Sequence, residues 1–289
     1  MADESQKPES QKPESKRRLI DRLVRLDRRI LFVIIAVCVA VPLLTRAKMK
    51  MSITAPVQSL YDAIDKLKPG SYVWLATDYD PGSMPELYPM NMALVEHLMS
   101  RDVKIVCASL WSPGAPLAQR VFDAVAPRYG KKYGVDYVNL GFKEGREAVM
   151  LSAAENIKGT FPQDFFGTPW DSIPMLKDVR NLRNAGMIVS VSAGYPGLKE
   201  WIQQVGTRFN MTIGGGVTAV SAPEMYPYIQ SGQLVGLLAG MKGAAEYEQL
   251  MKRPGLAVAG MVAQSSVHVM VVVFIIFSNV AFFVEKRKK

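Results

Sequence analysis

The sequence predicts an α/β fold, a Rossmann-like domain with a parallel sheet, flanked by two transmembrane helices. Two observations point to this class. An uninterrupted apolar run lies near each end of the 289-residue chain, and strand-like and helix-like segments alternate between the runs. Alternation of this kind is typical of a parallel sheet covered by helices. An apolar run of about 20 residues is typical of a helix that crosses a bilayer.

The first apolar run, residues 30–44, contains no charged side chain and has basic residues on both sides. At about 1.5 Å per residue it spans about 23 Å, which is less than the ~30 Å of hydrocarbon in a bilayer. Snorkelling arginines can make up this difference. A buried core helix is the alternative, but such a helix rarely has basic residues at both ends. We therefore expect a first transmembrane helix over residues 30–46.

The second apolar run, residues 269–284, is interrupted only by Ser278 and Asn279, and it predicts a transmembrane helix over residues 262–284. A basic tail, residues 285–289, follows it. Basic residues are also more numerous before the first run than after it. Because cytoplasmic flanks carry the excess of Lys and Arg, we expect a two-pass protein with cytoplasmic termini and the central domain on the opposite side.

The basic residues that precede the first run also predict contact with the membrane surface. Residues 16–29 read as an amphipathic helix with an arginine face, formed by Arg17, Arg18, Arg22, Arg25, Arg28 and Arg29. Such a helix is attracted to anionic lipid. Much of the net charge of +9 lies here and in the basic tail, without interleaved aromatic residues, so we expect the lipid bilayer and not nucleic acid as the partner. Residues 1–15 repeat the polar unit ESQKP and are expected to be a disordered tail.

Residues 52–253 carry the alternating pattern of the α/β domain. We predict strands over 72–77, 104–110, 136–140 and 187–192, with a fifth over 211–213 or 217–220. Helices are predicted over 87–100, 117–129, 146–156, 175–185 and 198–205, and again from Pro223 through Leu250. Three consecutive strand–turn–helix units of similar length favour a Rossmann-like sheet, but the strand order cannot be read from the pattern.

Acidic side chains follow the first predicted strand. Asp78 and Asp80 stand in the segment DYDPGS, which ends with Ser83. Ligands of open parallel sheets bind beyond the carboxyl ends of the strands, and a pair of carboxylates suits Mg²⁺. The segment VWLATDYDPGS resembles the first motif of the haloacid-dehalogenase-like phosphatases, which implies a nucleophile at Asp78 and a general acid at Asp80. The later acidic pair of that family is missing, and the same residues also form an ordinary turn.

A glycine run, Gly214, Gly215 and Gly216, could bring backbone N–H groups close to a phosphate, with Ser192 at the end of a neighbouring strand. The run matches neither a dinucleotide-binding fingerprint nor a P-loop, and a tight strand bend explains it equally well. These residues, with Asp78, Asp80 and Ser83, are the candidate ligand-binding residues.

A second glycine pattern lies in the helix predicted after Pro223. Gly232, Gly236 and Gly240 recur at every fourth position, and Ala244 continues the row. On a helix these residues form one smooth stripe that lets another backbone approach. We expect either close packing on the domain's own sheet or contact with a neighbouring subunit.

Cysteine and histidine give little chemistry. The two cysteines, Cys38 and Cys107, fall in the first apolar run and in a strand, so no disulfide or metal site is expected. His97 is expected at the surface or boundary of a helix, and no complete catalytic constellation is evident. We expect no cofactor.

The sequence therefore predicts a non-catalytic, membrane-anchored subunit that acts in structure, assembly or interaction, as a homo- or hetero-oligomer. Two alternatives stay open. One is a membrane-tethered enzyme or sensor that uses Asp78 and Asp80 with a metal and a phosphorylated ligand. The other is an exported module that binds a small molecule.

Overall fold

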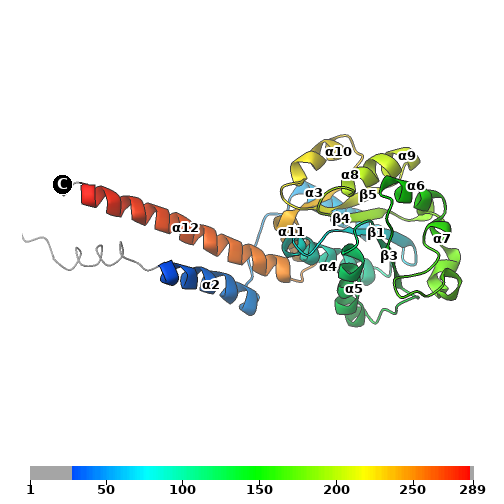
Figure 1. Cartoon of the computed structure of the whole chain (residues 1–289), viewed down its shortest axis with the longest axis horizontal. Coiled ribbons are helices and arrows are strands. Elements are labelled where there is room, and N and C mark those ends of the chain that lie inside the picture. The colour runs from blue at the N-terminus through cyan, green and yellow to red at the C-terminus, as the bar shows by residue number, and fades with distance from the viewer. Residues whose placement is uncertain (1–27, 287–289) are drawn as a thin grey trace, which may run out of the picture. The chain divides into compact units, whose positions relative to one another are not determined.

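The computed structural model describes residues 28–286, and these divide into two units. One unit, Arg46–Met261, contains the sheet and the helices that cover it (Figure 1). The other contains the apolar segments through Thr45 and from Val262 onward. The predicted tail over residues 1–15 lies outside the described residues, as do Arg17, Arg18, Arg22 and Arg25.

The sheet has six parallel strands in the order β3-β2-β1-β4-β5-β6, so the α/β fold class is confirmed. The order reverses between β1 and β4, as in Rossmann-like folds, where ligands bind beside that switch point. Asp78, the last residue of β1, pairs with Ser192 of β4, which places the carboxyl ends of these strands together. The strands are β1 (Tyr72–Asp78), β2 (Lys104–Ser109), β3 (Tyr137–Phe142), β4 (Ile188–Ser192), β5 (Ile213–Val217) and β6 (Leu237–Ala239).

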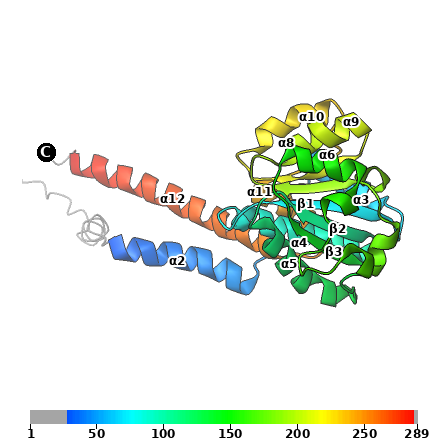
Figure 2. The ribbon, with the colours of Figure 1, turned by 45° about the vertical axis from the view of Figure 1, so that its right-hand side comes forward.

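Helices cover both faces of the sheet (Figure 2). One face packs against α3 (Ala55–Asp65), α4 (Met84–Ser100), α5 (Gly114–Val125) and α11 (Gly240–Leu250). The other packs against α6 (Glu147–Glu155), α7 (Ile157–Thr160) and a continuous helical segment. That segment comprises α8 (Leu198–Glu200), a π-helical stretch (Trp201–Gly206) and α9 (Thr207–Phe209). The short helix α10 (Tyr226–Gln230) also belongs to this unit.

Side chains alternate between the two faces along each central strand, which gives two apolar layers. In β1, Val73 and Leu75 face the layer with α4, whereas Trp74 and Ala76 face the layer with α6. All seven residues of β1 are buried. A parallel strand covered on both sides is expected to be apolar along its whole length, which is why the pattern of residues 72–77 was readable.

The first four strands and the helices α4, α5 and α6 lie where the sequence predicts them. The fifth strand lies between the two predicted alternatives, over the glycine run itself. Two predicted helices are wrong. Residues 175–185 form short 3-10 turns, Pro174–Asp178 and Leu182–Asn184. The helix predicted from Pro223 through Leu250 is broken by β6, because a turn at Gly232 with φ +76° ends the helical path.

The glycine stripe is therefore wrong as a helical feature. Gly232 lies in a turn, Gly236 precedes β6, and Gly240 and Ala244 belong to α11. A Cβ on Gly236 would lie 2.4 Å from the backbone nitrogen of Leu60 in α3. Close approach to the domain's own helix thus accounts for this glycine. Contact of these residues with a neighbouring subunit stays a prediction.

Among the described residues, one helix is long and apolar enough to cross a membrane. It is α12 (Leu256–Lys286), whose stretch Leu256–Val280 has a mean hydropathy of 2.0. The other apolar helix, α2 (Arg28–Thr45), has a shorter apolar stretch of 17 residues, Arg29–Thr45. The expectation of two full-length spans is thus corrected to one candidate span and one shorter apolar helix, because the apolar stretch of α2 has only 17 residues.

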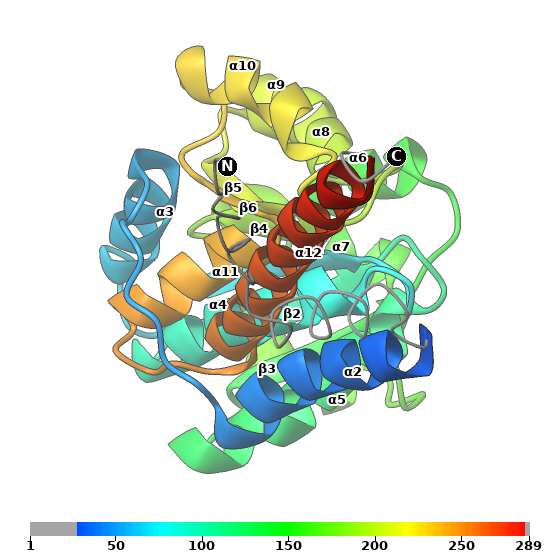
Figure 3. The same ribbon diagram turned by 90° about the vertical axis from the view of Figure 1, so that its left-hand side faces the viewer.

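The helix α11 holds both ends of the α/β unit, and it lies beside α3 and α4 (Figure 3). The buried Glu246 accepts hydrogen bonds from the backbone N–H of Thr54 at 2.8 Å and from its hydroxyl at 2.7 Å. Gln249 exchanges two 2.8 Å bonds with the backbone of Met51. The segment that leads from residue 46 into the domain is therefore fixed on α11.

The opposite end of the unit is fixed by a second buried acidic residue on the same helix. The Glu248 carboxylate accepts hydrogen bonds from the backbone N–H groups of Gly255, Ala257 and Val258, at 2.8 to 3.0 Å. These N–H groups lie at the start of α12, where the first donors have no partner within the helix. Burial raises the pKa of Glu248, although the three backbone donors act against that rise.

Candidate functional site

Asp78 lies at the switch point of the sheet and is completely buried. One carboxylate oxygen accepts a hydrogen bond from the backbone N–H of Leu110 at 2.6 Å, and the other accepts one from the indole N–H of Trp201 at 3.3 Å. The carboxylate thus joins β1 to the loop after β2 and to the helical segment after β4. Burial raises the pKa of Asp78 to about 7, against the lowering effect of these donors.

Asp80 lies two residues further along, in a different environment. Its carboxylate accepts hydrogen bonds from the backbone N–H and the hydroxyl of Ser83, each at 3.0 Å, and so closes the turn before α4. Asp78 faces the interior while Asp80 and Ser83 are engaged with each other. Within residues 28–286 no group of three or more His, Cys, Asp or Glu side chains could hold a metal ion.

The nucleophile that the phosphatase resemblance implies at Asp78 needs a carboxylate that a substrate can reach. Here the carboxylate is enclosed by its own chain and accepts hydrogen bonds from two directions. The arrangement of Asp78 and Asp80 therefore supports a structural use of both residues.

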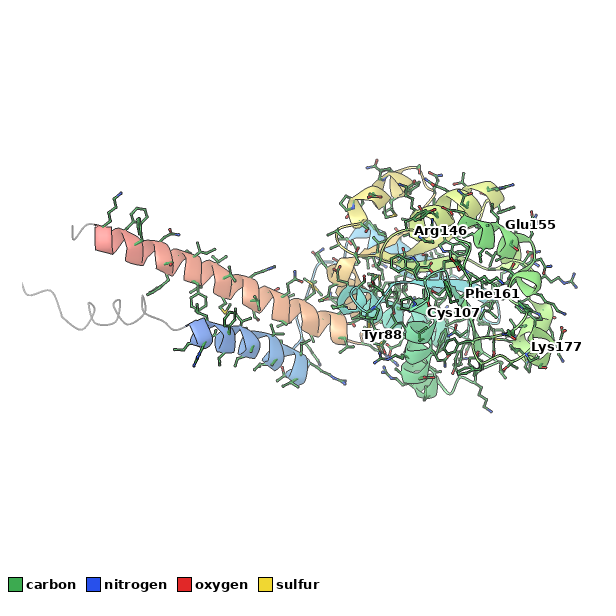
Figure 4. The ribbon with its side chains drawn as sticks, in the orientation of Figure 1. Tyr88, Cys107, Arg146, Glu155, Phe161 and Lys177 are labelled. Carbon is green, nitrogen blue, oxygen red and sulfur yellow. The ribbon has the colours of Figure 1, made fainter. Side chains whose placement is uncertain are left out.

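The loops at this edge of the sheet are tied to one another. The indole N–H of Trp111, after β2, donates to the carbonyl of Pro196, after β4, at 2.9 Å. The hydroxyl of Tyr195 donates to Glu147 of α6 at 2.6 Å, and the guanidinium of Arg146 stacks 5.3 Å from the Tyr195 ring centroid. Arg146 lies with α6 in Figure 4. These contacts connect the loops at the carboxyl ends of the strands to one another.

Three of these loops share a sequence pattern that the sequence-based predictions missed. Thr77–Gly82, Ser109–Gly114 and Ser192–Gly197 each begin with a hydroxyl residue and end with Pro-Gly. In the last two loops a residue other than glycine does not fit, because its Cβ would clash with the end of the preceding strand. A Cβ on Gly114 would lie 2.2 Å from the Ser109 hydroxyl, and a Cβ on Gly197 would lie 2.7 Å from the Ser192 hydroxyl. The shared pattern therefore occurs where a strand is followed by a turn and a helix, and where the first turn of that helix packs against the end of the strand.

The glycine run does not lie beyond a strand end, as the phosphate hypothesis requires. Gly214, Gly215 and Gly216 form the centre of β5 and pair with β4, and the last two pair also with β6. A Cβ on Gly215 would lie 1.9 Å from the carbonyl oxygen of Ser190, and one on Gly216 would lie 1.9 Å from the sulfur of Met90. Their backbone groups are used by the sheet and their small size by packing, so the phosphate expectation is corrected.

A cavity of about 280 Å³ opens next to the switch point, between the ends of β4 and β5. Ser192, one of the predicted ligand-binding residues, lies in its wall. Sequence reasoning missed the other polar residues of the wall, Tyr195, Lys199, Glu200, Ser221 and Glu224. Their convergence depends on how the loop after β4 packs on the turn after β5, which no local pattern reports.

His97 is buried, not at the surface, and this corrects the sequence expectation. Its ring stacks on Tyr61 with the centroids 4.4 Å apart, and its Nδ1 lies 2.7 Å from the hydroxyl of Tyr247. Its Nε2 lies 3.6 Å from the carboxylate of Asp65. Burial lowers the pKa of His97 to about 4, although Asp65 acts in the other direction. Cys107 is also buried, within β2 (Figure 4).

Comparison of the chain with family models, curated proteins and solved structures found no match.

Proposed function

We propose that the chain is a membrane-anchored, non-catalytic α/β subunit that acts in the structure or assembly of a membrane complex. The observation that carries this proposal is the fixation of both ends of the α/β unit on α11, through Glu246, Glu248 and Gln249. These bonds bring both ends of the α/β unit onto one helix, so both apolar segments leave the domain from that helix, as suits a domain anchored at its two ends.

The chemistry at the sheet edge agrees with a non-catalytic role. Asp78 is engaged in bonds to Leu110 and Trp201, and Asp80 in bonds to Ser83. The alternative of an enzyme or sensor built on Asp78 and Asp80 therefore has little support from the geometry.

The proposal includes a two-pass topology with cytoplasmic termini. The apolar stretch of α12 is long enough for one crossing. For α2, 17 residues correspond to about 25 Å, and the basic residues at both of its ends can snorkel to the interfaces. Its apolar side chains are largely exposed in the structure, among them Phe32, Val33 and Leu44, which suits contact with lipid.

Two measurements test the anchoring. The full chain should stay in the membrane fraction after carbonate washing of native membranes. In a chain whose Cys38 and Cys107 are changed to alanine, single cysteines placed at Glu144 in the domain and at Glu14 in the tail should react with an impermeant thiol reagent from opposite sides. Release by carbonate, or labelling of both sites from one side, would contradict the topology.

The assembly role is tested separately. Cross-linking in native membranes should trap the chain with further copies or with other membrane proteins, and the same species should persist after mild detergent extraction. A chain that remains monomeric at every concentration, and that cross-links to nothing, would refute the assembly role and leave the anchoring intact.

A second candidate function is an exported module that binds a small molecule. The cavity between β4 and β5 favours it, because ligands of open α/β sheets occupy this edge.

A further inference from the structure

The cavity between the ends of β4 and β5 contains buried polar groups whose hydrogen-bonding capacity is only partly used. Ser192 is 2% exposed, and its oxygen accepts a hydrogen bond from the backbone N–H of Leu198 at 2.9 Å. No acceptor for its hydroxyl proton is present within residues 28–286. This proton is therefore available to an oxygen or nitrogen atom of a ligand.

Glu200 provides the complementary group. It is 9% exposed, and one carboxylate oxygen accepts a hydrogen bond from the backbone N–H of Gly197 at 2.8 Å. The other carboxylate oxygen accepts none from the described part of the chain, and no cation pairs with Glu200 there. This second oxygen is open to the cavity, where a ligand that donates a hydrogen bond to it can replace water.

The charged residues of the cavity wall indicate the sign of the ligand's charge. The wall carries two carboxylates, Glu200 and Glu224, and one ammonium, Lys199. Lys199 lies 3.8 Å from Glu224, and both side chains are substantially exposed, so this pair sits at the rim and is weak. The buried charge is thus negative, which disfavours phosphates and favours a cation.

Size sets a further limit. A volume of about 280 Å³ corresponds to roughly nine water molecules at the volume of liquid water, ~30 Å³ each. The cavity therefore has room for a small molecule.

We propose that this cavity binds a small amino alcohol or amino sugar, whose protonated amine donates to Glu200 and whose neighbouring oxygen accepts from Ser192. The inference rests on the second candidate function, not on the assembly role, and it gives that function a ligand class. Charge-assisted hydrogen bonds of this kind are stronger than neutral ones, so the amine contributes most of the affinity.

The test uses the full chain in detergent and measures binding by titration calorimetry and by the melting temperature from tryptophan fluorescence. The probes are glucosamine and ethanolamine, with glucose and inorganic phosphate for comparison. At least one amine should bind and raise the melting temperature, and glucose should bind at least about 10-fold more weakly than that amine. Binding of glucosamine alone identifies an amino sugar, and binding of ethanolamine alone a small amino alcohol.

Variants connect the binding to the cavity. Glu200→Gln keeps an oxygen for the Gly197 N–H but removes the charge, and it should weaken amine binding about 10-fold or more. Lys199→Met removes the cation at the rim, which repels a protonated amine, and should strengthen amine binding. Asp171→Asn, which removes an exposed carboxylate elsewhere, is the matched control and should change neither.

The inference is overturned if neither amine binds, if phosphate binds in their place, or if Glu200→Gln binds the amine as well as the original chain while melting at a similar temperature. Each of these results concerns the cavity alone. The cross-linking result described above would be unaffected, so failure of the ligand proposal and failure of the assembly proposal are distinguishable.

Discussion

The stability of the α/β unit should contain two large pH-dependent contributions of opposite sign between pH 4 and 7, in addition to that of Glu248. They arise from Asp78 and His97, which are buried in different parts of the unit. Each has a pKa in the folded chain that differs from its ordinary value by more than two units. A change of one unit corresponds to about 1.4 kcal/mol of differential interaction, so both effects are large enough to measure.

Asp78 destabilises the fold as the pH rises. Its pKa is about 7 when folded and 3.8 when unfolded, so between these values the unfolded chain is ionised while the folded chain keeps the proton. The unfolded state then binds fewer protons, and the free energy of unfolding falls as the pH increases. The contribution present at pH 4 is lost by pH 7, at most about 4 kcal/mol.

His97 acts in the opposite direction. Its pKa is about 4 when folded and 6.5 when unfolded, so between these values the unfolded chain takes up a proton that the folded chain does not. Neutral His97 therefore contributes about 3 kcal/mol to the free energy of unfolding above pH 6.5, and this contribution is lost as the pH falls from 6.5 to 4. The two contributions largely cancel in the original chain.

Single variants should separate the two slopes. Asp78→Asn removes the first titration, so its free energy of unfolding should gain up to about 4 kcal/mol relative to the original chain from pH 4 to 7. His97→Asn keeps an acceptor for Tyr247 but should lose about 3 kcal/mol of relative stability as the pH rises from 4 to 6.5. Each variant also carries a pH-independent cost, which does not affect the slope.

The assay is urea unfolding of the full chain in detergent, at intervals between pH 4 and 8, followed by tryptophan fluorescence. All four tryptophans lie in the α/β unit, so the signal reports its unfolding alone. Asp171→Asn controls for the loss of one exposed carboxylate. Parallel pH profiles for Asp78→Asn and the original chain would refute the reasoning for Asp78, and a slope of the wrong sign in His97→Asn would refute it for His97.

Three further predictions concern the framework. Glu248→Ala removes the partner of three backbone N–H groups and should lower the free energy of unfolding by about 1–3 kcal/mol, as measured by the same urea unfolding. An unchanged unfolding midpoint would show that water replaces the carboxylate. Gly215→Ala should prevent normal pairing of β5 and greatly reduce the folded yield. Gly232 has open space around it but a φ of +76°, so Gly232→Ala should lower the free energy of unfolding by only about 1 kcal/mol. Equal effects in the two variants would contradict the packing argument. Glu246→Ala should free the segment around Thr54 and speed tryptic cleavage after Lys50, and an unchanged cleavage rate would mean that Gln249 suffices.

The central strands were predictable because each is a short apolar run with β-branched residues, closed by a turn with Pro and Gly. The strand β6 was not, because it has three residues and stands between Gly236 and Gly240, in a window whose glycine spacing imitates a helical stripe. In residues 175–185 the apolar residues are spaced as in a helix, but the segment forms separate 3-10 turns that pack in the apolar layer with α6. In both places the tertiary environment overrides the local pattern.

The candidate site was predictable in its location and not in its chemistry. Asp78 and Ser192 stand at strand ends, and the parallel sheet brings them side by side. The sequence could not report that Trp201, 123 positions later, donates to Asp78 and encloses it. It also could not report that Glu200 faces a cavity, because the wall depends on contacts between loops far apart in the chain.

The joint fixation of Met51 and Gly255 on α11 has a consequence for how the protein can be rebuilt. In topological terms the α/β body is an insert between two apolar segments, and its own ends meet on a single helix. Such a body can be moved as one cassette into a surface loop of another scaffold, or its ends can be joined and new termini opened elsewhere. The apolar segments can likewise be exchanged without a change in the sheet.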